Sequence, residues 1–115
     1  RRHARPSPRA RRIRARAMSG VDDARLALLA ETFKLLGDPT RLRVLLTCLD
    51  GPVAVGDIAR RTGASQPLVS HHLRLLRGAR LVRGERQARQ VLYEADDAHV
   101  RDMLLDMLDH TGEHA

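Results

Sequence analysis

Five side chains near the C-terminus are of the types that bind divalent metal ions: Asp97, His99, His110, Glu113 and His114. Two imidazole nitrogens and two carboxylate oxygens make a tetrahedral donor set that suits Zn²⁺ or Co²⁺. Because this set contains no thiolate, softer ions such as Cd²⁺ fit it poorly. Ni²⁺ usually takes five or six ligands, and it remains an alternative if His114, His3 or the N-terminus extends the shell.

The spacing of these residues limits how such a site could close. His99 and His110 are 11 residues apart, so on one helix they project from nearly the same face but lie ~16 Å apart along the axis. That separation is far beyond the coordination shell of one ion. Two copies packed antiparallel would place Asp97 and His99 of one chain beside His110 and Glu113 of the other. His114 is an alternative to Glu113, because both residues share the face of His110.

Apolar residues on the same segment provide a reason for two chains to associate. They recur at the i, i+3, i+4, i+7 spacing of an amphipathic helix, and a second such stripe lies in residues 21–36. We therefore predict a homodimer whose interface includes Leu26, Leu29, Val100, Met103, Leu104 and Met107.

Start and stop signals along the chain predict the elements that carry these side chains. Helices are expected at 21–36, from Pro39 to about 49, at 55–62, from 65 to about 77, and from 98 onward, with Asp96 or Asp97 capping the last. Residues 81–87 and 90–95 alternate as two short strands around Ala88 and Arg89. The predicted fold is mainly α with a small β-hairpin wing, in the order α-α-α-α-β-β-α.

The charge of the chain is unevenly distributed. Residues 60–89 carry eight arginines and one glutamate, whereas residues 94–115 carry seven acids and one arginine. Two short helices joined at Gly63 and followed by a basic hairpin are typical of a winged helix-turn-helix, which binds double-stranded DNA. Small polar side chains would read bases and arginines would contact phosphates. The predicted contacts are Ser65, Gln66, Ser70, His71, His72, Arg74, Arg83, Arg86 and Arg89. Packing inside the protein is the alternative for His71 and His72.

Composition excludes several other classes. No apolar run is long enough for a membrane span, and the two aromatic residues, Phe33 and Tyr93, are too few to stack single-stranded nucleic acid. The single cysteine, Cys48, is expected to be a small buried hydrophobic residue. No phosphate loop or catalytic grouping is present, and four protein ligands would leave a zinc ion no position for a reactive water. An enzyme is therefore not expected.

Residues 1–19 contain a dense run of arginines and two prolines, which predicts a disordered arm ahead of a folded domain at 20–115. The arginines of this arm would bind DNA phosphates. Alternatively, the protein begins at Met18, and the upstream residues are a passive tail or a reading-frame artefact.

Three segments, LLGDPTRLRVLLTCL, VGDIARRTGASQPLVSHHLRLLRGARLV and GERQARQVLYEADDAHV, occur in order over about residues 24–114. In these segments the chain resembles the ArsR/SmtB family of winged-helix metal-sensing repressors. The resemblance implies a cytoplasmic homodimer that represses metal-handling operons and releases operator DNA on binding metal.

The pattern Asp-x-His, ten residues, then His-x-x-Glu resembles the zinc site on the C-terminal helix of that family. The resemblance assigns Asp97, His99, His110 and Glu113 as ligands, with His114 as the alternative because some relatives have histidine at the last position. Two other functions remain open: a metal-independent winged-helix repressor with a degenerate metal site, and a non-specific nucleic-acid compaction protein driven by the arm.

Overall fold

The computed structural model describes residues 7–9, 11 and 20–114 of the chain. These residues belong to two compact units that divide between Thr32 and Phe33. The predicted arm, residues 1–19, lies almost wholly outside the described residues, and so does His3.

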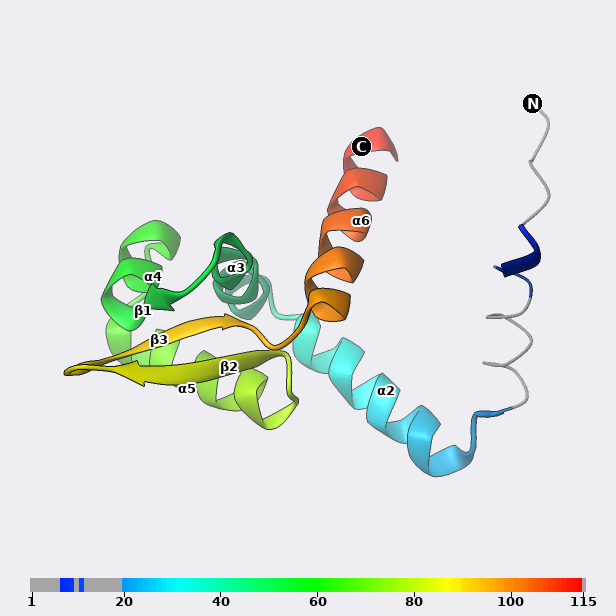
Figure 1. Ribbon diagram of the computed structural model, residues 1–115, viewed down its shortest axis with the longest axis horizontal. Helices are drawn as coiled ribbons and strands as arrows, with labels where there is room; N and C mark the ends of the chain where they lie inside the picture. Colours follow the sequence, from blue (N-terminus) through cyan, green and yellow to red (C-terminus); the bar gives the residue numbers. More distant parts are fainter. Residues whose placement is uncertain (1–6, 10, 12–19, 115) are drawn as a thin grey trace. The chain divides into compact units, whose positions relative to one another are not determined.

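The element order confirms the predicted mainly helical fold with a small wing (Figure 1). The elements are α2 (Asp23–Leu36), α3 (Pro39–Thr47), the 3-10 turn η1 (Cys48–Asp50), β1 (Val53–Ala54), α4 (Val55–Thr62), α5 (Gln66–Gly78), β2 (Val82–Gln87), β3 (Gln90–Ala95) and α6 (Ala98–His114). Strand β1 was not predicted, and it pairs antiparallel with β3 through Val53 and Tyr93 to give the sheet order β1-β3-β2. Two residues are too few to show a period, so only the pairing with β3 reveals this strand.

Side chains cap the helices at the predicted places. Asp38 Oδ1 accepts a hydrogen bond from Arg41 N at 2.9 Å, and Ser65 Oγ accepts one from Leu68 N at 3.3 Å. Asp97 Oδ1 accepts one from Val100 N at 3.0 Å, so Asp97 caps α6. Each cap satisfies a backbone N–H group that has no partner within its helix.

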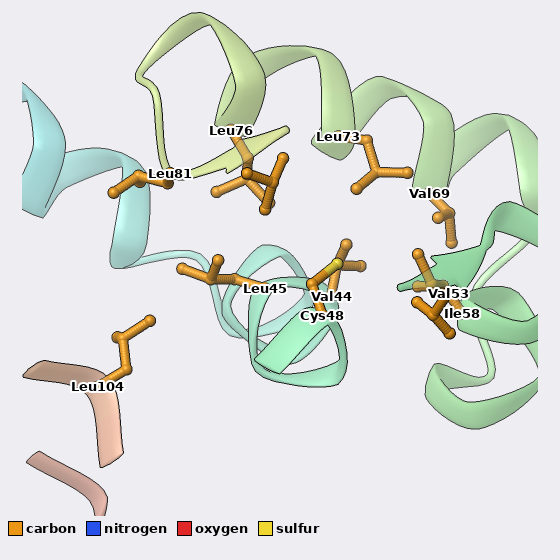
Figure 2. Close-up of a cluster of buried hydrophobic side chains, with 11 residues drawn as sticks. Val44, Leu45, Cys48, Val53, Ile58, Val69, Leu73, Leu76, Leu81 and Leu104 are labelled. Atoms are coloured by element: carbon orange, nitrogen blue, oxygen red, sulfur yellow. The ribbon is translucent and has the colours of Figure 1, made fainter. Parts of the chain in front are cut away.

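The core of the second unit joins α3, α4 and α5 to the wing and to α6 (Figure 2). Its buried members are Val44, Leu45, Cys48, Val53, Ile58, Val69, Leu73, Leu76, Leu81, Val82 and Leu104. Figure 2 shows Leu104 extending from α6 toward Leu45. Leu104 was predicted to lie at the dimer interface, and this assignment is corrected because its side chain is 6% exposed and packs inside its own protomer. Among the described residues, no helix combines the length and apolar character needed to cross a membrane.

Gly63 ends α4 in the left-handed region, with φ at 75°. A Cβ added at this position would have no atom within 4 Å, so the cost of a side chain would be purely conformational. We expect Gly63→Ala to lower the free energy of unfolding by about 1 kcal/mol, measured by urea denaturation.

Gly78→Ala is the matched control for this substitution. Gly78 is the last residue of α5, its φ is not positive, and it has equally open surroundings. Alanine there should be neutral or stabilise the protein by up to about 1 kcal/mol. Equal losses in the two variants would contradict the conformational explanation.

Candidate nucleic-acid interface and metal-binding helix

Helix α5 separates its side chains into a buried face and an exposed polar face. Val69, Leu73 and Leu76 are buried in the core. The predicted base-reading and phosphate-contacting residues at the start and along the open face are exposed: Ser65, Gln66, Ser70, His71 and Arg74. The apolar face therefore holds α5 against α3 and α4 and leaves these side chains available to DNA.

His72 does not fit the prediction that it contacts DNA. Its side chain is 4% exposed, and its Nδ1 accepts a hydrogen bond from Nε of Arg41 at 3.3 Å. A residue enclosed in this way does not reach a base edge. Position 72 lies three residues after Val69 and four before Leu76, so helical periodicity places it on the buried stripe.

The wing arginines differ in their surroundings. Arg86 and Arg89 are exposed, and Arg89 lies in the turn between the paired residues Gln87 and Gln90. Arg83 is tied across the hairpin to Glu94, with Nη2 2.7 Å and Nε 2.9 Å from Oε1. This hydrogen-bonded pairing raises the pKa of Arg83 and compensates its positive charge, so Arg83 offers a phosphate less than a free arginine would.

A cleft of about 220 Å³ lies between α5 and β3, lined by Ser70, Leu73, Arg74, Arg77 and Tyr93. Within the described part of the chain Arg74 and Arg77 have no ion-pair partner, whereas Arg60 and Arg61 pair with aspartates. Arg77 and Tyr93 were not among the predicted contacts. The four-residue spacing from Ser70 to Arg74 and the three-residue spacing to Arg77 are the sequence signal for Arg77.

Gly84 allows the Tyr93 ring to lie across β2. A Cβ at Gly84 would come within 2.9 Å of Tyr93 Cε1 and 3.0 Å of Val91 Cγ1. Gly84 and Tyr93 are paired residues in the hairpin. The glycine therefore keeps room for the ring that closes one side of the cleft.

Helix α6 carries the predicted metal ligands at its two ends. At the start, His99 Nδ1 lies 3.8 Å from Asp97 Oδ1, and the His99 side chain is 99% exposed. His110 and Glu113 are exposed in the last turns, while the side chain of His114 lies outside the described residues. Within one protomer, the described residues include no group of three or more His, Cys, Asp or Glu side chains that could hold a metal ion. The four predicted ligands therefore lie two at each end of α6, and none of the described residues completes a site within one protomer.

Between these ends, α6 presents apolar side chains to solvent. Met103, Leu105, Met107 and Leu108 are exposed, and Val100 is half-buried. In α2, Leu26 and Leu29 are exposed as well. Contiguous apolar side chains that are open to water are typical of a protein–protein contact.

Cys48 is buried in η1, as predicted. Burial raises the pKa of its thiol to about 12. The thiol therefore stays protonated near neutral pH, which disfavours it as a metal ligand.

Residues 38–83 match the arsR family of bacterial regulatory proteins. The HTH-type transcriptional regulator KmtR of Mycobacterium tuberculosis is 38% identical over 102 residues, which cover 86% of this chain and 78% of KmtR. NmtR, an HTH-type transcriptional regulator of the same organism, is 38% identical over 98 residues, covering 85% of this chain and 82% of NmtR. The chain belongs to the arsR family.

Solved structures agree with the assignment to the arsR family. The solution structure of apo-NmtR superposes with a TM-score of 0.66 at 39% identity, covering 83% of this chain and 79% of that one. The homodimeric winged helix-turn-helix DNA-binding domain of Mb0332 from Mycobacterium bovis superposes with a TM-score of 0.75 at 28% identity, covering 83% and 91%. This arsR-family chain is thus a DNA-binding transcriptional regulator with a winged helix-turn-helix, and its relatives are regulators rather than enzymes.

Proposed function

We propose that this regulator is a metal-responsive repressor that binds operator DNA as an apo homodimer and releases it when Zn²⁺ binds between two C-terminal helices. The observation that carries the proposal is the layout of α6, which has a pair of ligand-type residues at each end and exposed apolar side chains between them. Each end holds half of a tetrahedral set, and an antiparallel partner helix supplies the other half.

The chemistry of the side chains fits this ion. Asp97 and His99 of one protomer and His110 and Glu113 of the other would provide two nitrogens and two oxygens, with His114 as the alternative to Glu113. Asp97 uses Oδ1 to cap α6, which leaves its second carboxylate oxygen for a ligand bond. When bound, the ion would tie the two α6 helices together, and Co²⁺ or Ni²⁺ would act at the same place.

The effect on DNA follows from linkage. In the apo dimer, the two α5 helices would sit at a separation that fits successive major grooves. If the metal favours a dimer geometry that fits DNA less well, DNA must weaken metal binding by the same factor. Release then requires no contact between the metal and DNA.

A gel-shift titration with Zn²⁺, Co²⁺ and Ni²⁺ tests the proposal, using an operator duplex that the wild-type protein selects from random-sequence DNA. Equilibrium dialysis should give two ions per dimer, and Co²⁺ should show a tetrahedral absorption spectrum. An absence of binding at micromolar zinc would instead support a metal-independent repressor. The role of Asp97 as an ordinary helix cap favours that second candidate.

We also expect Arg77 to contact the DNA backbone through the cleft beside β3. Arg77→Gln should weaken binding to all sequences alike and lower the slope of log affinity against log salt by about 1, because one phosphate contact is lost. Fluorescence anisotropy at several salt concentrations measures this slope.

Arg43→Gln is the matched control, since it removes the same charge from an exposed position on α3, outside the cleft. Its slope should stay close to the wild-type value. Equal changes in the two variants would mean that net charge, rather than a contact in the cleft, sets the salt dependence.

A further inference from the structure

Within the second unit, one arginine side chain of α3 is hydrogen-bonded to α5 and to the last turn of α2, which belongs to the same unit. Arg41, near the start of α3, donates from Nη1 to the carbonyl oxygen of Leu35 in α2 at 2.9 Å. It donates from Nε to Nδ1 of His72 in α5 at 3.3 Å. Asp38 Oδ1 accepts a hydrogen bond from the backbone N–H of the same arginine. The backbone of Arg41 is therefore held by Asp38, and its guanidinium is hydrogen-bonded to both α2 and α5.

The bond between Arg41 and His72 requires a neutral imidazole. Nδ1 can accept only when its lone pair is free, so the ring proton must be on Nε2. A protonated ring would direct a second donor at the guanidinium and place two cations together in a buried site. Protonation therefore breaks this bond.

The groups around the ring favour the neutral form. Burial lowers the pKa of His72 below its usual 6.5, and the charges of Arg41 and His71 act in the same direction. Asp38, at the N-cap of α3, acts in the opposite direction. A histidine whose pKa is lowered by folding does not change the free energy of unfolding at pH values above its unfolded pKa, because the ring is then neutral in both states. It destabilises the folded arrangement as pH falls from about 6.5 toward the lowered pKa.

The hydrogen bond between Arg41 and His72 lies on the buried side of α5, opposite the face that is exposed to solvent. Ser70, His71 and Arg74 are exposed on this helix, within two residues of His72. Apolar packing by Val69 and Leu73 holds α5 in place but is not directional. A hydrogen bond from a planar guanidinium has a defined direction and so selects one rotation of the helix about its axis.

We infer that Arg41 and neutral His72 form a positioning pair that sets the rotation of α5 for DNA binding, so that protonation of His72 weakens the complex. The inference rests on DNA binding by α5 and does not depend on the proposed metal site. Arg41 and His72 act through the helix and do not touch DNA themselves.

The test is the pH dependence of operator affinity without metal, measured by anisotropy in EDTA from about pH 7.5 to about pH 5.5. Wild-type affinity should fall by about fivefold or more over this range. His72→Asn places a neutral amide oxygen near the position of Nδ1 and cannot titrate, so it should bind tightly at the higher pH and change less than about twofold.

His71→Asn is the matched control, because it removes the exposed neighbouring imidazole from the same helix. His71 is itself a predicted DNA contact, so this variant should bind more weakly at both pH values but keep the wild-type ratio of affinities between them. A His72→Asn profile as steep as that of the wild type would overturn the inference.

Arg41→Lys keeps the charge but not the two-directional donor geometry. It should bind the operator more weakly than the wild type at the higher pH while keeping its helical circular dichroism. Wild-type affinity in this variant would also overturn the inference. If Arg41→Lys does not fold, the His72→Asn profile decides alone. Because metal is absent throughout, failure of the metal site would leave these results unchanged.

Discussion

His110→Ala should bind operator DNA as tightly as the wild type and no longer release it when Zn²⁺ is added. Couplings between two sites usually amount to about a 5- to 150-fold change in affinity. We expect wild-type release in that range and less than about a twofold effect in the variant. Anisotropy titrations with and without Zn²⁺ measure the difference. The substitution acts twice, because the symmetric dimer would contain two copies of the site.

Asp109→Ala is the control for this experiment. Asp109 is exposed and adjacent in sequence, but the turn of about 100° per residue directs it away from the face of His110. This variant should release DNA at the wild-type zinc concentration. Release by His110→Ala at that same concentration would show that His110 is not a ligand.

The same titration decides the fourth ligand. Glu113 and His114 both follow His110 closely enough to share its face. Of Glu113→Ala and His114→Ala, only the variant that removes the true ligand should lose release.

Much of the fold could be predicted because its signals are local. Asp38 and Ser65 cap helices where their types and positions indicated, and Gly63 ends α4. The hairpin follows from strand alternation on both sides of Ala88, which adopts a φ of 55°. Such signals act within a few residues of the chain, so they are present in the sequence itself. Strand β1 depends on a partner that is distant in sequence.

The candidate site was less predictable, because exposure depends on neighbours from other elements. His71 and His72 are identical in type, yet one is exposed and the other is enclosed beside Arg41. The periodicity of α5 would have separated them. No comparable local rule separates Leu104 from Met107, since a protomer core and a dimer interface both select apolar residues.

On α6, Leu104 is buried in the protomer core whereas Met107 is exposed, and substitution of Met107 should have the second large effect. Met107→Glu should dissociate the dimer, because Met107 is 55% exposed in the protomer and available to a partner. Burial of a methionine contributes about 1.5–3 kcal/mol, and in a symmetric interface the substitution occurs on both sides. A loss of about 3–6 kcal/mol weakens the dimer by at least about 100-fold. Analytical ultracentrifugation over a concentration series measures this shift.

Dissociation should remove metal binding together with operator affinity, because each predicted metal site takes ligands from two chains. Asp102→Ala also changes the charge of α6 by one unit, in the opposite sense and away from the face of Met107, and should leave the dimer intact. Circular dichroism should show that the Met107→Glu protomer stays folded, since its core side chain, Leu104, is untouched. A monomer that still binds zinc with wild-type affinity would place all the ligands within one chain. A dimer that persists would place the partner on another face, and in either case the antiparallel α6 arrangement would be wrong.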